Sequence, residues 1–145
     1  MATAYGWTAS GLQPFPVPPG TFVETPRFES LATGLVSSVA DQLRFLAALA
    51  IGGAPVLGPA TMSEMRTDQL ADHQRPGSDG FLGAGSGWGH QVEVRADGCF
   101  GWAGGLGTIG YADPRSGRAA VLFTQCSVEA PGTQAAFDAF WSLLA

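Results

Sequence analysis

The segment Arg118–Gln125 constrains the fold more than any other part of this sequence. Its centre, Ala119–Phe123, is apolar at every position. It therefore lacks the alternation of apolar and polar residues that is typical of a strand with one solvent-exposed face. A strand of this kind is buried on both faces. The chain therefore needs a sheet whose two faces are both covered by other structure.

Further strand-like segments precede this one and are joined to one another by short connections. They are residues 88–95, 99–103 and 108–112. Residues 113–117 read Asp-Pro-Arg-Ser-Gly, which is a turn composition. Short connections join neighbouring strands as antiparallel hairpins. We therefore expect an antiparallel sheet of three to four strands.

Helices are predicted on both sides of these strands in the chain. Ser37 or Ser38 can cap a helix that stops at Gly52–Gly53, and Pro59 favours the start of a short second helix ending near Thr67. The apolar stripe of the first helix is Val39, Leu43, Leu46 and Ala50. A last helix over 132–145 carries Phe137, Phe140, Trp141 and Leu144 on one side. The fold class is α+β, with helices covering the sheet.

The chain of 145 residues has the size of one domain. Residues 1–34 are expected to be irregular, because Pro14–Gly20 is rich in proline and favours polyproline II. Residues 35–145 then form the α+β part. An opening this long without regular structure is unusual for an independent domain.

The amino-acid composition limits the classes of molecule that this chain is expected to bind. The net charge is −5 and the chain holds no lysine, so neither nucleic acid nor an anionic membrane is an expected partner. No apolar run is long enough to span a bilayer, and the N-terminus lacks the pattern of a secretory signal. A cytoplasmic location and free thiols at Cys99 and Cys126 are therefore expected.

A search for catalytic motifs finds no complete one. The chain has no Gly-x-Ser-x-Gly elbow, and a Ser-x-x-Lys pair is impossible without lysine. His73 and His90 lack the close spacing of a zinc site, so we expect no metal and no cofactor. The alternating glycines from Gly83 to Gly89 miss the dinucleotide fingerprint and indicate a flexible approach to a strand.

The most distinctive segment is Phe100–Thr108, which reads Phe-Gly-Trp-Ala-Gly-Gly-Leu-Gly-Thr. Glycines at a strand end let a ligand approach the backbone and free N–H groups to face an anion, and Trp102 would add a flat apolar wall. A bulged hairpin with an aromatic core residue is the alternative.

Several motifs in order resemble β-lactamase-like serine hydrolases, a group that includes class C β-lactamases, penicillin-binding-protein-like peptidases and esterases. The matching stretches are Gly34–Asp41 with Arg44–Leu46, Leu57–Met62, Met65–Leu70, Gly101–Gly105, Tyr111–Pro114 and Val121–Gln125. Nearly the whole chain is covered. The resemblance implies an incomplete fold of this type, whose missing first strands would leave a sheet edge and a face uncovered.

The resemblance also implies which residues line the site. Trp102, Ala103 and Gly104 correspond to the third family motif, Lys/His-Thr/Ser-Gly, in a form similar to the Trp-Gly-Gly of esterases. Gly105 then corresponds to the residue whose N–H helps to form the oxyanion hole. Tryptophan cannot pair with a carboxylate as lysine does, so the resemblance favours an esterase over a β-lactamase. Tyr111-Ala112-Asp113 fits a strand-to-turn position and not the Tyr-x-Asn motif.

The leading hypothesis is therefore the C-terminal portion of a serine hydrolase, truncated before its nucleophile and inactive alone. Its partner would be the missing N-terminal part or a second copy of the chain. One alternative is a non-catalytic interaction module that uses an exposed sheet edge, and another is a small-ligand binding domain.

Overall fold

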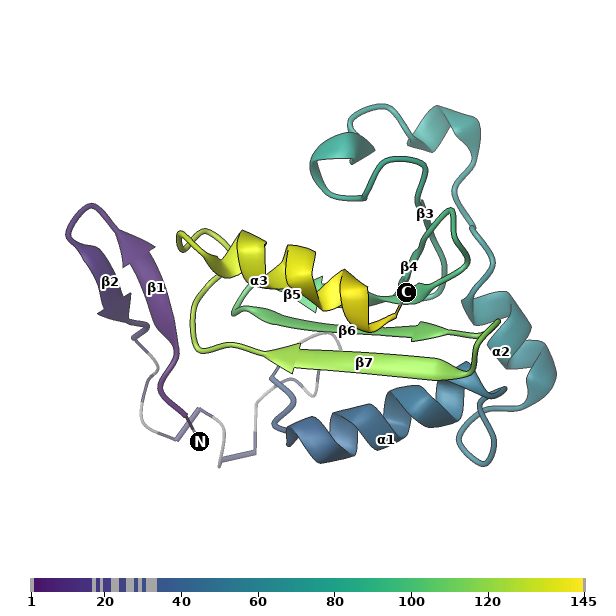
Figure 1. Ribbon diagram of the computed structural model, residues 1–145, viewed down its shortest axis with the longest axis horizontal. Helices are drawn as coiled ribbons and strands as arrows, with labels where there is room; N and C mark the ends of the chain where they lie inside the picture. The colour runs from purple at the N-terminus through teal and green to yellow at the C-terminus, as the bar shows by residue number, and fades with distance from the viewer. Residues whose placement is uncertain are drawn as a thin grey trace.

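The computed structural model describes residues 2–16, 18, 20–21, 24–25, 28, 30 and 34–144 (Figure 1). Its centre is an antiparallel sheet with the strand order β3-β4-β5-β6-β7. The strands are β3 (Gly87–Trp88), β4 (Glu93–Val94), β5 (Phe100–Gly104), β6 (Thr108–Asp113) and β7 (Arg118–Phe123). The α+β class and the antiparallel sheet are confirmed.

The sheet has more strands than expected, because the predicted strand over 88–95 is a hairpin. The chain turns between β3 and β4, where the Gly89 N–H donates to the Val92 carbonyl at 2.9 Å. Gln91 adopts a positive φ of 63° in this turn. Alternation of side chains continues across a tight turn, so the pattern alone does not reveal the reversal.

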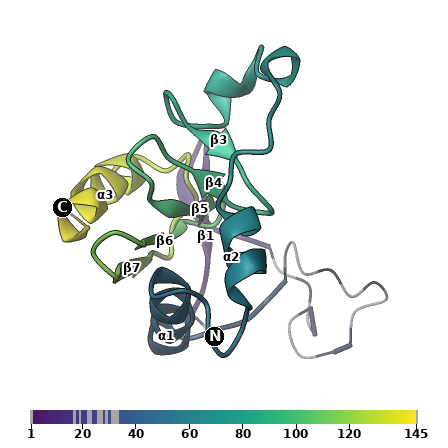
Figure 2. The same cartoon turned by 90° about the vertical axis from the view of Figure 1, so that its right-hand side faces the viewer.

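Helices cover both faces of the sheet, as Figures 1 and 2 show. On one face lie α1 (Val39–Ala50) and α2 (Pro59–Met65), packed on Phe100 and Ala112. On the other lie α3 (Thr133–Phe140) and the 3₁₀ turn η3 (Trp141–Leu143). In β7, Ala120 faces α3 and Val121 faces α1. Both faces of this strand are therefore covered, but of its residues only Ala120 is fully buried and Phe123 is 36% exposed, so the predicted burial on both faces holds only in part.

Helix α1 begins as expected and buries only part of its predicted stripe. Ser38 is the N-cap, and its hydroxyl accepts the Asp41 N–H at 3.1 Å. Leu46 and Ala50 are buried, but Val39 and Leu43 are 47% and 39% exposed. The stripe prediction is therefore wrong for the first half of the helix, where nothing in the described structure covers the apolar side chains.

Residues 1–34 are not irregular throughout. β1 (Tyr5–Thr8) and β2 (Gly11–Pro14) form a two-stranded antiparallel hairpin apart from the main sheet (Figure 1). Gly11 takes a φ of +91° at the turn, and the Thr8 hydroxyl donates to its carbonyl. The polyproline II expectation falls partly on Val17 and Pro19, which lie outside the described residues.

The hairpin joins the main body beyond the end of β7. Tyr5 forms a parallel bridge with Cys126: its N–H donates to the Gln125 carbonyl at 2.7 Å, and its carbonyl accepts from Ser127 at 2.8 Å. Along its own length β7 pairs with β6 alone among the described strands. An open sheet edge, expected from the resemblance, is therefore present there.

Two expectations about the whole chain can be compared with the structure. Cys99 is buried and Cys126 is half-buried, and both thiols are free as predicted. Within the described ranges, no helix combines the length and the apolar character that crossing a bilayer requires.

Candidate functional site

The end of β5 has one open side. β4 pairs with β5 only at Phe100 and Gly101, so Trp102, Ala103 and Gly104 have a neighbouring strand on the β6 side alone. Cys99 turns its carbonyl toward β4, where it accepts the Arg95 N–H at 2.9 Å. By the alternation of a strand, Ala103 presents its backbone N–H and C=O on this same open side.

The turn Gly104–Gly107 follows β5 directly and is anchored by backbone hydrogen bonds from the segment 124–128. The Gly107 N–H closes it on the Gly104 carbonyl, and the Gly107 and Gly105 carbonyls accept N–H groups from Thr124 and Val128 at 2.9 and 3.0 Å. Gly105 itself is exposed. Within the described part of the chain its N–H has no hydrogen-bond partner. The structure thus places a fixed but unused N–H donor beside Trp102, Ala103 and Gly104.

Trp102 belongs to an aromatic cluster of three side chains: Phe81, Trp88 and Trp102. The ring centroids of Phe81 and Trp88 each lie 4.7 Å from that of Trp102, and the Trp88 and Trp102 rings meet edge to face. Phe81 and Trp88 are 5.7 Å apart. These separations are typical of attractive aromatic pairs. The half-buried Trp102 is therefore supported from two sides.

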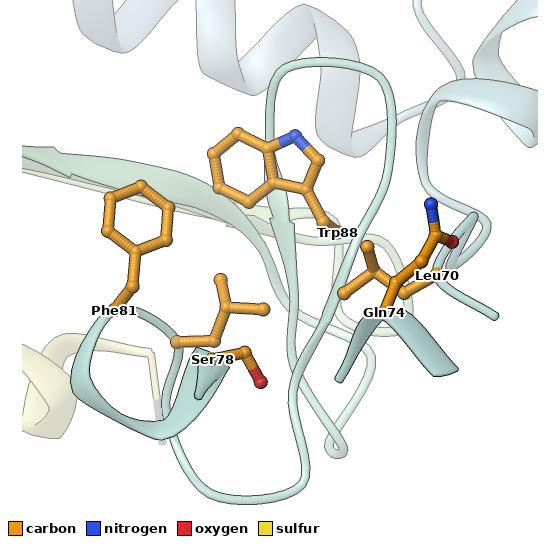
Figure 3. A pocket seen from close by; sticks show the side chains of 6 residues that line it. Leu70, Gln74, Ser78, Phe81 and Trp88 are labelled. Carbon is orange, nitrogen blue, oxygen red and sulfur yellow. The ribbon is translucent and has the colours of Figure 1, made fainter. Parts of the chain in front are cut away.

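A pocket of about 200 Å³ lies against this cluster. Its lining residues are Leu70, Gln74, Ser78, Phe81, Leu82 and Trp88. Figure 3 shows the Phe81 and Trp88 rings on one side of the pocket, with Leu70 and Gln74 toward the other. Residues from the segment 70–82 and from β3 thus line one open pocket beside the aromatic cluster.

Asp68 fixes the position of Trp88. Its carboxylate accepts the backbone N–H groups of Trp88 and Leu70, each at 3.0 Å, and forms an ion pair with Arg75. Partial burial works against the charged form, but the hydrogen bonds from Leu70, Arg75 and Trp88 prevail and lower the Asp68 pKa. Gly87 leaves room for this carboxylate, because a Cβ at that position would lie 2.0 Å from the Asp68 Cγ and displace it.

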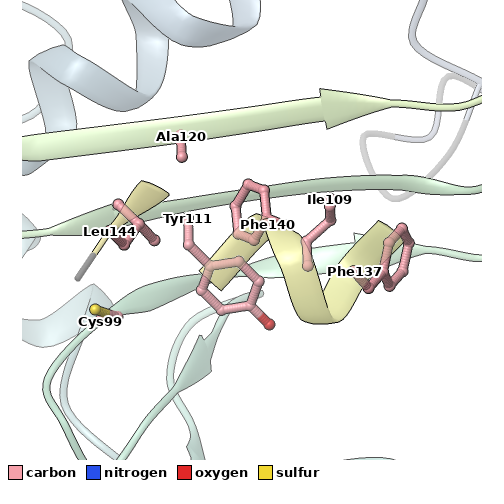
Figure 4. Close-up of a cluster of buried hydrophobic side chains, with 7 residues drawn as sticks. All are labelled: Cys99, Ile109, Tyr111, Ala120, Phe137, Phe140 and Leu144. Atoms are coloured by element: carbon pink, nitrogen blue, oxygen red, sulfur yellow. The ribbon is translucent and has the colours of Figure 1, made fainter. Parts of the chain in front are cut away.

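Glu93 anchors the loop that carries Phe81. It is only 4% exposed, and its Oε1 accepts the Gly83 N–H at 3.0 Å. Its Oε2 accepts the hydroxyl of Tyr111, which lies in the core beneath α3 (Figure 4). Burial, followed by the bond to Glu93, raises the pKa of Tyr111 far above its ordinary range. This carboxyl therefore ties Phe81's loop to β6.

Other candidates from the sequence lie away from this site or have structural roles. His73 and His90 are both exposed, and the described residues contain no group of three or more His, Cys, Asp or Glu able to hold a metal ion. Burial raises the Cys99 pKa to about 11, which leaves the thiol unreactive. Of the alternating glycines, Gly89 lets the Met65 carbonyl approach, since a Cβ would lie 2.0 Å from that oxygen.

Sequence reasoning missed Phe81, Asp68 and Glu93. Phe81 lies between the helices and strands predicted from the sequence, and its role depends on a contact with Trp102 twenty-one positions away. Asp68 lies in the matching stretch Met65–Leu70 and Glu93 in the predicted strand over 88–95, but no pattern assigned either side chain a role of its own.

Comparisons with known proteins agree with this architecture. The family model described as "Beta-lactamase" matches residues 2–143. The structure of "EstCE1, a hydrolase with promiscuous acyltransferase activity" superposes with a TM-score of 0.77 over 99% of this chain and 43% of that one, at 22% identity. At this identity the superposition establishes a shared fold.

Two curated relatives from Mycobacterium tuberculosis match part of the chain. They are "Uncharacterized protein MT1414" of strain CDC 1551 / Oshkosh and "Protein Rv1367c" of strain H37Rv. Each is 36% identical over 113 residues, which covers 63% of this chain and 28% of the relative. The matched region is thus well under half of each longer protein.

Proposed function

This chain belongs to the beta-lactamase family, and from that premise we propose that it is the C-terminal portion of an esterase-like serine hydrolase. In this proposal the chain supplies the inner strand β5 and one oxyanion-hole donor, Gly105. The nucleophile comes from residues outside these 145. The observation that carries the proposal is the unused Gly105 N–H at the open side of β5.

The geometry at Gly105 suits an acyl transfer. A tetrahedral intermediate develops negative charge on the former carbonyl oxygen, and fixed N–H donors stabilise that charge without having to reorient. The Gly105 N–H shares a peptide plane with the Gly104 carbonyl, which accepts the Gly107 N–H at 2.9 Å, and the Gly105 carbonyl in the next peptide accepts the Val128 N–H at 3.0 Å, so the donor needs little reorganisation. Trp102, Ala103 and Gly104 would then lie along the substrate, with the Ala103 backbone able to bond an extended ligand.

The absence of lysine decides what this chain can do alone. The acyl-enzyme mechanism of this family needs a serine activated by a base, and the Ser-x-x-Lys arrangement cannot occur in a chain without lysine. An oxyanion donor without a nucleophile stabilises a transition state that never forms. We therefore expect no catalysis until the missing elements are supplied.

The test is a short-chain ester assay on this chain alone. We expect hydrolysis of a p-nitrophenyl ester to stay at the buffer rate, and a fluorophosphonate serine probe to leave the protein unlabelled. The positive control is a complete member of the family at the same concentration. Turnover that stops when a single probe-labelled serine is replaced by alanine would show that the nucleophile lies within this chain.

A second candidate, a non-catalytic interaction module, is favoured by a different observation. Apolar side chains lie exposed before and along the start of α1, with Leu35 at 75% and Val36 at 57%, and β7 has an open edge. Exposed edges and apolar patches pair with other chains. This candidate predicts a discrete oligomer in light scattering, which Val121→Pro in β7 should dissociate. A monodisperse monomer contradicts it.

A further inference from the structure

We propose that the pocket bounded by Phe81 and Trp88 binds a single apolar ring, the aryl or cycloalkyl group of an ester substrate. This inference rests on the proposed hydrolase function for its biological meaning. The ring would lie against the aromatic cluster, while the ester group extends past Trp102 toward Gly105.

The size of the pocket fits one ring. Its volume is about 200 Å³, and a dry protein cavity of roughly 150 Å³ is enough to hold benzene. A fused ring system or a long acyl chain would extend beyond it. The pocket therefore has room for one ring and would leave the rest of a larger ligand outside it.

The chemistry of the lining also favours an apolar ring. Leu70, Leu82, Phe81 and Trp88 form its walls, and Gln74 and Ser78 supply the polar groups. Among the lining residues none is charged, so an ionic group would lose its hydration without gaining a counter-ion. Rings meet the faces and edges of aromatic side chains favourably at the distances that this cluster already shows.

The position of the pocket connects it to the proposed site. Phe81 and Trp88 line the pocket and also contact Trp102, so only the thickness of this cluster separates the pocket from β5. Trp102 lies two residues before Gly104 and three before Gly105. A ligand in the pocket thus touches the same aromatic cluster that forms the substrate-facing wall.

Phe81 is poised to respond to a ligand. It is 65% exposed although it contacts two indole rings, so much of its surface remains available. The backbone of its loop is anchored nearby by the Glu93 bond to Gly83. Phe81 is therefore a side chain whose removal should alter the pocket and leave the buried core in place.

The experiment is a titration of the chain with benzyl alcohol, followed by the indole N–H signals of its four tryptophans in two-dimensional NMR. We expect saturable shifts at Trp88 and Trp102, and none at Trp7 or Trp141. Glycerol, a polar molecule of similar size, should produce no saturable shift.

Phe81→Ala should weaken the binding of benzyl alcohol at least about fivefold, since it removes one wall of the pocket. The matched control is Phe28→Ala, because Phe28 is 81% exposed and lines no part of the pocket.

Two results would overturn the proposal. One is equal shifts at all four indoles, which indicates non-specific association. The other is unchanged affinity in Phe81→Ala. Neither reading involves turnover, so serine-dependent ester hydrolysis by this chain with an intact titration rejects the proposed function alone, and a failed titration without turnover rejects the ring pocket alone.

Discussion

Replacing Gly107 by alanine should lower the free energy of unfolding by more than about 3 kcal/mol. Gly107 has a φ of +85°, which disfavours any residue with a side chain. In addition, a Cβ at this position would lie 1.9 Å from the Cys126 carbonyl oxygen and 2.2 Å from the Thr124 Oγ1. The turn would have to separate from the segment 124–128 to admit one methyl group.

Urea unfolding followed by tryptophan fluorescence measures this effect. The matched control is Gly105→Ala, two residues earlier in the same turn, where a Cβ would meet no atom within 4 Å. That variant should unfold within about 0.5 kcal/mol of the unchanged chain. If both glycine variants are equally stable, the close approach of Cys126 to Gly107 does not exist in solution.

The second large effect is expected from Tyr111→Phe, at about 1.5–3 kcal/mol of lost stability. The substitution keeps the ring in the core and removes the hydroxyl that donates to Glu93. The Glu93 Oε2 would then be buried without that donor, because the residue is only 4% exposed. The loss should also reach Gly83, whose N–H is held by the other oxygen of the same carboxyl.

The chain offers a natural control for this variant, since Tyr5 is its one other tyrosine. The Tyr5 ring is half-buried, and its bonds to Gln125 and Ser127 use the backbone, so Tyr5→Phe should be nearly neutral. Hydrogen exchange adds a second measurement. Faster exchange at Gly83 in Tyr111→Phe, with exchange at Gly107 unchanged, is expected if Glu93 anchors that loop. Unchanged exchange at Gly83 would count against it.

Local patterns predicted those parts of the fold whose signal is contained in a few adjacent residues. Ser38 caps α1 because its hydroxyl reaches only three residues ahead, and the uniform apolar run in β7 predicted that other elements pack on both of its faces. The β3–β4 hairpin was missed for a complementary reason. Gly89 begins the turn, but the residue with the positive φ is Gln91, so the turn lacks the Asn-Gly or Asp-Gly pair that marks a tight hairpin in a sequence.

The candidate site was only partly predictable. Trp102, Ala103, Gly104 and Gly105 were found because the glycine-rich strand and a family resemblance pointed to the same place. Their roles in substrate and oxyanion binding remain predictions. Phe81 and Glu93 were missed because their importance comes from contacts across the fold, to Trp102 and Tyr111, that no local periodicity encodes.

The bridge at Tyr5 has a consequence for what holds this site in place. Gly105 is tied to Val128, and the neighbouring Ser127 is tied to Tyr5, so two contacts join segments that are distant in the chain. Closing such long loops lowers the conformational entropy of the chain, and only the contacts formed afterwards compensate for this loss. The segment 124–128, which supports the Gly105 turn, is therefore itself held by the N-terminal hairpin, so a change in that hairpin can reach the turn through two consecutive contacts.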